Sequence, residues 1–246
     1  MSPAHGETIT PDGVRIDYHV YAQPGRQSVV VVGHGFFQSK ETAAFRQINR
    51  ALAKHHDVVA LDFRGHGRSG GLYTFSARES DDLRAVLSQV RPRYQRIGLM
   101  GFSLGGAIAI NLLGEGDDGV RSLVAVSAPS AFEEIEFKFW TPEAVRTGLR
   151  AMGPGAGCRP GSPLLPKARP VESVQRLVGL PKLFIHGTRD VIVGVEHGRR
   201  LYAAAPEPKR LEIIEGGSHA EQLFRDAPDR LSGLVSKWFD ETLAPA

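Results

Sequence analysis

A glycine-flanked segment near the middle of the chain constrains the fold more than any other stretch. Residues 97–100 form an apolar run bounded by polar residues, which is typical of a strand buried on both faces of a parallel sheet. Residues 104–113 are rich in alanine and leucine and predict a helix. Only Gly-Phe-Ser-Leu-Gly at 101–105 connects the two, so the chain must reverse within a few residues.

The two glycines of this pentapeptide explain how so sharp a turn can form. Without a Cβ at Gly101 and Gly105, the strand and the helix approach closely, and Ser103 is pushed out at the carboxyl end of the sheet. The following helix points its free N–H groups and positive dipole end at the same spot, which favours a developing negative charge. This position suits a nucleophile, although such a pentapeptide also occurs in ordinary strand-to-helix turns.

The length and composition fit one globular domain, residues 1–246. The chain is 41% hydrophobic and 23% charged, which is typical of a soluble protein with a large core. Its net charge of +3 comes from scattered arginines, so we expect no nucleic-acid partner. The single cysteine excludes an intrachain disulfide. No secretory-signal pattern or membrane-length apolar run is present, so we expect a cytoplasmic protein, and the sequence gives no indication of oligomeric state.

Alternating strand and helix patterns predict one doubly wound, mostly parallel sheet of about eight strands flanked by helices. A hairpin pattern at residues 7–21 predicts an antiparallel start to this sheet. Ser76 and Glu79 have the spacing of a capping box at the start of a helix. The later strands are predicted at residues 28–32, 57–61, 97–100, 122–126, 182–185 and 210–214, and the helices at 41–55, 76–91, 104–113, 194–205 and 221–242.

A long insertion interrupts this alternation. About fifty residues, 130–180, separate two strands that a compact α/β unit joins with far fewer. Aromatic residues gather in its first part, including Phe132, Phe137 and Trp140, and its later part is dense in glycine and proline. We expect a small lid whose aromatic residues either line a pocket or pack the lid onto the body.

The candidate catalytic groups all follow predicted strands. In an open parallel sheet, chemistry collects where strands end at the carboxyl edge. A serine hydrolase needs a hydroxyl nucleophile, an imidazole base, a carboxylate that orients the imidazole, and N–H donors for an oxyanion. Ser103, His219, Asp190 and the loop after residues 28–32 supply one candidate for each role.

Three further histidines, His34, His66 and His186, are expected to have structural roles rather than to form a metal site. His34, His66 and His186 lie in glycine-containing loops, where we expect them to bond to the backbone. The histidines lack metal-ligand spacing, and Asp62 is expected to anchor its loop rather than to bind a metal. The glycine loops also lack the patterns of nucleotide-binding motifs.

The order of Ser103, Asp190 and His219 along the chain resembles that of the α/β-hydrolase fold. The sequence looks like a serine esterase or lipase of that superfamily over nearly its whole length. Five motifs carry the resemblance: His-Gly-Phe at 34–36, Asp-x-Arg-Gly-His-Gly-x-Ser at 62–69, Gly-Phe-Ser-Leu-Gly at 101–105, His-Gly-x-x-Asp at 186–190 and Gly-Ser-His at 217–219.

The resemblance implies a role for each candidate residue. Ser103 would be the nucleophile, His219 the general base and then general acid, and Asp190 the orienting carboxylate. The oxyanion hole would consist of the backbone N–H groups of Leu104 and Phe36, with Phe37 as a substitute for Phe36. No cofactor or metal is expected. Substrate-binding residues are predicted from the aromatic pattern, as an apolar acyl or aryl pocket formed by Phe37, Phe102, Phe132, Phe137 and Trp140.

The predicted reaction is hydrolysis of carboxylic esters with small to medium acyl or aryl groups, through an acyl-enzyme intermediate. An acyl-thioesterase with the same catalytic residues is the first alternative. A non-catalytic, hydrolase-like receptor for a small molecule is an alternative of another class. Haloalkane dehalogenase activity is disfavoured, because those enzymes resemble this fold with an aspartate at the position of Ser103.

Overall fold

A sheet of eight strands lies at the centre of the computed structural model, which describes residues 2–116, 119–135 and 154–245. The strand order is β1-β2-β4-β3-β5-β6-β7-β8. The first two strands form the predicted antiparallel hairpin, and β2 pairs antiparallel with β4. The other six strands, β3 to β8, are parallel to one another. The strands are β1 (Ala4–Ile9), β2 (Arg15–Tyr21), β3 (Ser28–Gly33), β4 (Asp57–Leu61), β5 (Arg96–Phe102), β6 (Ser122–Val126), β7 (Lys182–Gly187) and β8 (Lys209–Ile214).

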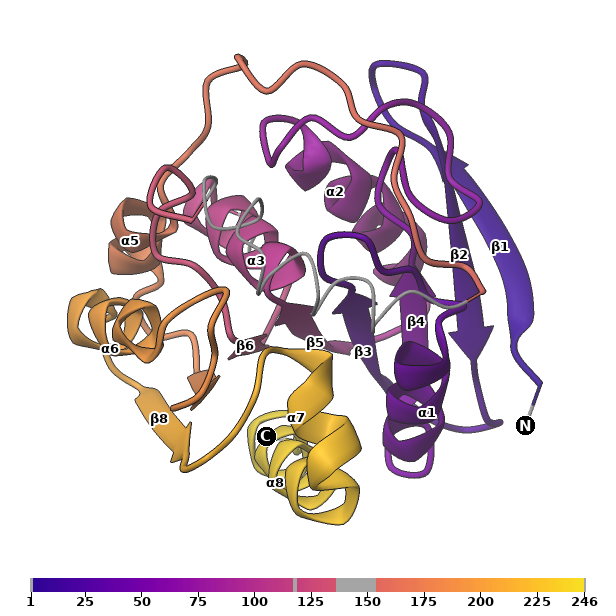
Figure 1. Cartoon of the computed structure of the whole chain (residues 1–246). Helices are drawn as coiled ribbons and strands as arrows, with labels where there is room; N and C mark the ends of the chain where they lie inside the picture. The colour runs from indigo at the N-terminus through magenta and orange to yellow at the C-terminus, as the bar shows by residue number, and fades with distance from the viewer. Residues whose placement is uncertain (1, 117–118, 136–153, 246) are drawn as a thin grey trace.

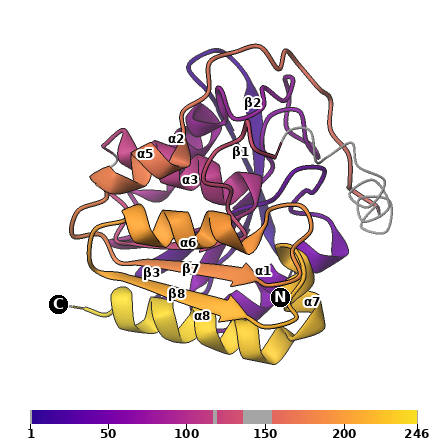
Figure 2. The same ribbon diagram turned by 60° about the vertical axis from the view of Figure 1, so that its left-hand side comes forward.

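Helices cover both faces of the sheet (Figure 1). Figure 2 shows α6 and α8 on opposite sides of β7 and β8. One face carries α1 (Ala43–Leu52), α7 (Glu221–Asp226) and α8 (Pro228–Thr242), and the other carries α2 (Glu79–Val90), α3 (Leu104–Gly114), α5 (Pro170–Ser173), the 3-10 turn η2 (Val174–Arg176) and α6 (Val195–Ala204). Among the described helices, none is both long and apolar enough to cross a membrane.

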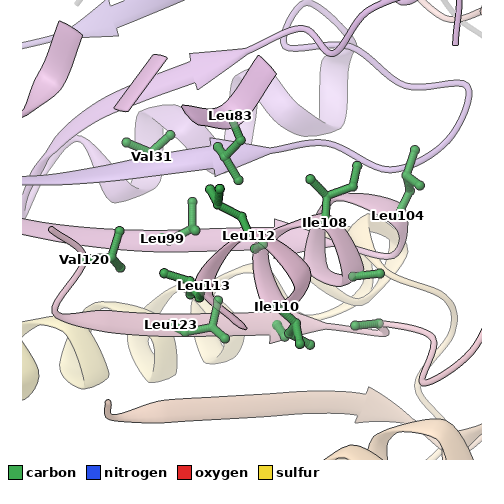
Figure 3. Close-up of a cluster of buried hydrophobic side chains, with 14 of the residues drawn as sticks. Val31, Leu83, Leu99, Leu104, Ile108, Ile110, Leu112, Leu113, Val120 and Leu123 are labelled. Carbon is green, nitrogen blue, oxygen red and sulfur yellow. The ribbon is translucent and has the colours of Figure 1, made fainter. Parts of the chain in front are cut away.

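The hydrophobic core consists of two clusters, one on each face. Val29 and Val31 of β3 belong to one cluster, while Val30 and Val32 belong to the other, because successive strand residues point to opposite faces. This explains the uniformly apolar strand sequences, since both faces are covered. Helix α3 is buried along its whole length, and its apolar side chains pack between β5 and α2 (Figure 3).

The predicted C-terminal helix at 221–242 is instead two helices, which meet at Ala227 and Pro228. Ala227 adopts a non-helical conformation, with φ −143° and ψ 63°. Proline lacks an N–H group and clashes with the preceding turn, so it suits the first turn of a helix rather than its interior. Pro228 therefore starts α8 rather than continuing α7.

The predicted capping box of Ser76 and Glu79 is also wrong. The Glu79 carboxylate accepts hydrogen bonds from the backbone N–H of Thr74 at 2.6 Å and from the Thr74 hydroxyl at 2.9 Å. The Thr74 hydroxyl in turn accepts the N–H of Arg78 at 3.0 Å. A threonine two residues earlier thus replaces Ser76 as the partner of Glu79.

Backbone hydrogen bonds join part of the predicted lid segment to the loop after β4. Arg159 donates its N–H to the Gly65 carbonyl at 2.7 Å and accepts the N–H of Tyr73 at 2.8 Å, and Gly161 donates to the Tyr73 carbonyl at 2.8 Å. Phe137 and Trp140 lie outside the described residues. The role of 130–180 as a lid therefore stays a prediction.

The packing of α8 makes a prediction for stability. Phe239 is fully buried, and its ring lies over β5 so closely that a Cβ on Gly98 would come within 2.6 Å of it. We expect Phe239→Ala to lower the free energy of unfolding, measured with urea, by about 3–5 kcal/mol, because it removes buried contacts and leaves a cavity. Leu72→Ala is the control, since Leu72 is 54% exposed and should change this free energy by less than about 0.5 kcal/mol. Equal effects of the two substitutions would contradict the packing.

Candidate active site

Ser103 lies at the turn between β5 and α3 in a left-handed backbone conformation, with φ +49° and ψ −113°. Its N–H donates to the carbonyl of Val126 at the end of β6, at 2.8 Å. The turn requires glycine on both sides, because a Cβ on Gly101 would lie 2.3 Å from the Gly105 carbonyl oxygen and a Cβ on Gly105 would lie 2.5 Å from the Gly33 oxygen. Contacts to two neighbouring strands thus hold the strained serine in place.

The predicted acid and base are hydrogen-bonded to each other. His219, after β8, places Nδ1 2.7 Å from Oδ2 of Asp190, which follows β7. The other carboxylate oxygen of Asp190 accepts the N–H groups of Ile192 at 3.0 Å and Val193 at 2.8 Å. Because the carboxylate accepts only when Nδ1 carries the proton, Nε2 of the neutral ring is left as the basic nitrogen.

Backbone contacts draw the acid and base loops together. The N–H of Arg189 donates to the Gly217 carbonyl at 2.9 Å. The two loops approach so closely that a Cβ on Gly187 would lie 2.3 Å from the same oxygen. Their separation is therefore fixed by the backbone as well as by the hydrogen bond between the side chains.

The end of β6 connects these loops to the serine. Val126 accepts the N–H of Ser103, and the hydroxyl of Ser127, the next residue, accepts the N–H of Ala220 at 3.0 Å. Ala220 directly follows His219. Three segments that are distant in sequence thus meet at one edge of the sheet.

Among the described residues, no hydrogen bond joins the Ser103 hydroxyl to the His219 imidazole. In the absence of substrate, the bond between a nucleophile and its base is often long or poorly aligned, and it tightens in the reacting complex. Ser103 and the hydrogen-bonded pair of Asp190 and His219 thus lie at the same edge of the sheet, and their joint catalytic role stays a prediction.

The pair is electrostatically matched. Burial alone would lower the pKa of His219, but the charge of Asp190 and its hydrogen bond raise it above the ordinary value. Burial alone would raise the pKa of Asp190, but the neighbouring His219 and the hydrogen bonds from His186 and His219 hold it well below the usual range. The buried carboxylate therefore stabilises an imidazolium at His219, which is the ion formed when the ring takes a proton from a serine.

These pKa shifts also fix the pH range in which the pair stabilises the fold. The contribution of His219 is complete below its unfolded pKa of 6.5 and is lost as pH rises through its raised folded value. The contribution of Asp190 is complete above its unfolded pKa of 3.8 and is lost as pH falls through its lowered folded value. Both contributions are therefore present together between about pH 3.8 and 6.5.

The predicted oxyanion donors come from segments that flank Ser103. The loop after β3 runs beside the turn at residues 101–105, since a Cβ on Gly35 would lie 3.5 Å from the Ser103 Cβ. Phe36 and Phe37 follow in this loop, and Phe37 has a positive φ of 62°. Leu104 is the first residue of α3, so its N–H has no acceptor within the helix. Their role as oxyanion donors stays a prediction.

A buried ion network anchors this loop. The fully buried Lys40 places Nζ 2.5 Å from a carboxylate oxygen of Asp62 and 2.5 Å from one of Asp17. The N–H of Lys40 donates to Asp62 at 2.8 Å, and the N–H of Arg68 does so at 2.9 Å. The prediction that Asp62 anchors its loop is confirmed. Buried charges of this kind need their partners, so the network fixes the segment between Phe36 and Lys40.

The structural roles predicted for His34, His66 and His186 are confirmed. His34 accepts the N–H of Phe63 at Nε2 at 3.1 Å and donates from Nδ1 to the Gly35 carbonyl at 2.7 Å, so neither nitrogen is left for catalysis. His66 bonds to the carbonyl of Arg64 at 3.0 Å, and burial lowers the pKa of His66 to about 3. His186 likewise bonds to a backbone carbonyl, that of Val193, at 2.7 Å.

The pocket role predicted for Phe102 is wrong, and the burial of Phe132 favours its packing in the core over a pocket role. Phe102 is fully buried, with its ring against Phe45 and Phe224 in the core on the face covered by α1, α7 and α8, so within the described part of the chain it is not accessible to a substrate. Phe132 is 6% exposed and belongs to the core cluster on the opposite face, which favours the packing alternative. Phe37 is half-buried beside Phe36, with ring centroids 4.5 Å apart.

Two aromatic residues near the site were missed in the sequence. Tyr73 and Phe75 lie in the loop after β4, and their ring centroids are 4.6 Å apart. Tyr73 lies 5.1 Å from Phe36, so a row of rings extends from the loop beside Ser103. The contact joins loops that follow different strands, and only the neighbouring glycines at 70–71 marked this segment as a loop.

Comparison with known proteins gives one family and a set of fold neighbours. Residues 28–151 match the family model described as alpha/beta hydrolase fold. The uncharacterized protein YfhR of Escherichia coli (strain K12) is 30% identical over 174 residues, which cover 68% of this chain. The same match covers 55% of YfhR, so the chain spans little more than half the length of this relative.

Two solved esterases have a similar fold. The esterase Pf2001 of Pyrococcus furiosus gives a TM-score of 0.79 at 23% identity, with 98% of this chain and 93% of that chain covered. The esterase RhEst1 of Rhodococcus sp. ECU1013 gives 0.78 at 24% identity, with 98% and 100% covered. At these identities the likeness shows the fold alone.

The charge coupling of the acid–base pair can be tested by NMR titration of the His219 ring. We expect a pKa above 6.5 in the natural protein and a value below 6.5 in Asp190→Asn, because the substitution removes the attracting charge and leaves the burial. Asp226→Asn is the control, since Asp226 is exposed on α7 and makes no contact with the His219 ring among the described residues. The same His219 pKa in all three proteins would contradict the coupling.

Proposed function

Because the chain belongs to the α/β-hydrolase fold family, we propose that it is a serine hydrolase that cleaves carboxylic esters with small to medium acyl or aryl groups. The observation that carries the proposal is the 2.7 Å hydrogen bond between His219 and Asp190, at the sheet edge where Ser103 ends the turn after β5. An acid, a base and a strained serine then serve one reaction rather than three unrelated structural roles.

The proposed reaction begins at the serine hydroxyl. Nε2 of His219 accepts the hydroxyl proton while Oγ of Ser103 bonds to the ester carbonyl carbon, and the electron pair of the carbonyl double bond moves to its oxygen. Asp190 holds the ring in the required tautomer and stabilises its charge. The N–H groups of Leu104 and of Phe36 or Phe37 then stabilise the oxyanion, where one such donor typically contributes about 3–4 kcal/mol.

The tetrahedral intermediate then collapses to an acyl-enzyme. The carbonyl re-forms, the bond to the leaving alcohol breaks, and His219 gives its proton to the departing oxygen. Water attacks the acyl group with His219 again as the base, and the second collapse releases the carboxylic acid and restores Ser103. These two half-reactions are complete with the groups that the chain supplies.

The surroundings of the site support this proposal. The raised pKa of His219 matches a ring that takes a proton from serine next to a buried carboxylate. The network around Lys40 fixes the loop that carries Phe36, as an oxyanion hole requires. Phe36 and Phe75 are partly exposed, both contact the buried ring of Tyr73, and they offer apolar surface for an acyl or aryl group.

Asp190 is a better candidate for the catalytic acid than Glu221, the other buried carboxylate nearby. Asp190 holds the His219 ring directly, whereas Glu221 starts α7 and burial raises its pKa.

Hydrolysis of acyl thioesters is the second candidate function, since it requires the same groups. A basic groove beside the site, described below, favours it.

Active-site labelling tests the proposed nucleophile. We expect a fluorophosphonate probe to label the protein once, at Ser103, and Ser103→Ala to lower kcat/KM for p-nitrophenyl butyrate to the background rate. Ser88→Ala is the matched control, because the Ser88 hydroxyl bonds to a backbone carbonyl on α2 away from the sheet edge. A folded natural protein that takes up no label and hydrolyses no ester would support the receptor alternative instead.

Replacement of the carboxylates tests the proposed acid. Asp190→Asn should lower kcat by about 10⁴-fold, because the ring loses its tautomer and its counter-charge. Glu221→Gln keeps the hydrogen bond between His219 and Asp190 and should retain most of the activity. A larger loss for Glu221→Gln than for Asp190→Asn would reassign the acid.

A further inference from the structure

A groove of about 880 Å³ lies between α1 and the α7–α8 pair, outside the site described above. These helices lie side by side on the same face of the sheet (Figure 1). Gln38 and Glu221 line one end of the groove, and Lys54 and His55 line the other. The groove thus follows α1 along its length.

The first end of the groove lies next to the proposed site. Gln38 is two residues after Phe36, and Glu221 is two residues after His219, so the Cα atoms of each pair are within about 8 Å. From Gln38 the groove follows α1 away from the sheet edge. The rise from Thr42 to Lys54, in a helix and its final turn, is about 18 Å.

One wall of the groove is basic. Arg46, Arg50 and Lys54 recur every four residues, so they share one face of α1 and its final turn, and all three are exposed. Arg46 has a distant partner in Glu41, at 4.0 Å. Within the described residues, Arg50 and Lys54 have no ion-pair partner. His55 and Arg225 also line the groove, but His55 lies 3.8 Å from Asp240 and Arg225 lies 3.6 Å from Asp226.

The opposite wall leaves room and offers hydroxyl groups. It is formed by α8, where Ser232, Gly233 and Ser236 line the groove, and a Cβ on Gly233 would meet nothing within 4 Å. The carboxylates of the groove, Glu221 and Asp229, start α7 and α8, whereas Arg50 and Lys54 are on the second half of α1 and in the turn after it. Asp240 lies 3.8 Å from His55 at this end, so the positive charge of the far part comes from Arg50 and Lys54.

We propose that this groove binds the phosphorylated end of a long thiol carrier, so that the same site also takes acyl thioesters whose phosphates contact Arg50 and Lys54 while the acyl group reaches Ser103. The proposal rests on the serine hydrolase function above. Guanidinium and ammonium groups form charge-assisted hydrogen bonds with phosphate, and arginine does so with two parallel bonds. A short neutral ester has nothing to occupy this end of the groove.

The reaction on this substrate follows the steps given above. Oγ of Ser103 bonds to the thioester carbonyl carbon, the C–S bond breaks, and the sulfur leaves with the proton held by His219. Water then hydrolyses the acyl-enzyme. The products are a carboxylic acid and the free thiol of the phosphorylated carrier.

A pair of matched thioesters tests the groove. Butyryl-coenzyme A and butyryl-N-acetylcysteamine share the acyl group and the thioester, but only the first carries nucleotide phosphates. We expect the natural protein to prefer butyryl-coenzyme A in kcat/KM by at least about tenfold, and this ratio to fall to near one in Arg50→Glu/Lys54→Glu through a higher KM. Arg93→Glu/Lys237→Glu changes the net charge equally at exposed positions outside the groove, and should keep the ratio.

The outcomes separate this proposal from the proposed function. A ratio near one in the natural protein, or a preference that persists in Arg50→Glu/Lys54→Glu, overturns the groove proposal while hydrolysis of the neutral thioester still supports a serine hydrolase. If no substrate is hydrolysed, calorimetry with coenzyme A still decides: binding that needs Arg50 and Lys54 supports the groove, and no binding overturns it. Binding to phosphatidylglycerol vesicles that needs the same residues, without binding of coenzyme A, overturns it in favour of a lipid surface.

Discussion

The contact between the end of β5 and the start of α3 determines the position of Ser103, the proposed nucleophile. Gly101 and Gly105 approach within a distance that admits no Cβ, and Gly105 packs equally closely on the backbone at the end of β3. The serine between them is held with a positive φ, and the first N–H groups of α3 face the same region. A side chain at either glycine would separate the strand from the helix, and the position of Ser103 would be lost.

The other components of the site are positioned relative to this contact by neighbouring strands. The end of β6 accepts a hydrogen bond from Ser103 and, one residue later, one from the segment after His219. On the other side, Lys40 joins the loop after β3 to Asp62 after β4. The proposed catalytic groups therefore lie on loops, but each loop is tied to a strand end of a rigid sheet, and rigid support of this kind is what precise positioning requires.

Much of this arrangement was predictable from the sequence, because the signals are local. Buried parallel strands have continuous apolar sequences, the sharp turn at 101–105 requires glycine, and strand ends in a parallel sheet meet at one edge. The hairpin, the parallel strands and the anchoring role of Asp62 followed from such signals. The pairing of Asp190 with His219 was likewise expected from their places after consecutive strands.

The features that were mispredicted depend on tertiary context. Phe102 borders the serine in sequence, but the alternation of side chains along β5 sends it into the core, against α1 and α7. The break at Pro228 was missed because the apolar spacing of a helix continues across it. The contact of Tyr73 with Phe36 and the basic face of the α1 groove depend on which loops and helices become neighbours, and no short stretch of sequence encodes that information.

We propose that residues 103, 190 and 219 act as one unit during acyl transfer. A crystal structure of the protein after reaction with a fluorophosphonate tests this proposal. We expect phosphorus bonded to Oγ of Ser103, with His219 Nε2 within about 3.2 Å of Oγ or of an oxygen on that phosphorus. The phosphoryl oxygen should face the N–H of Leu104. Phosphorus on another residue, or a His219 ring turned away from the adduct while still bonded to Asp190, would contradict it.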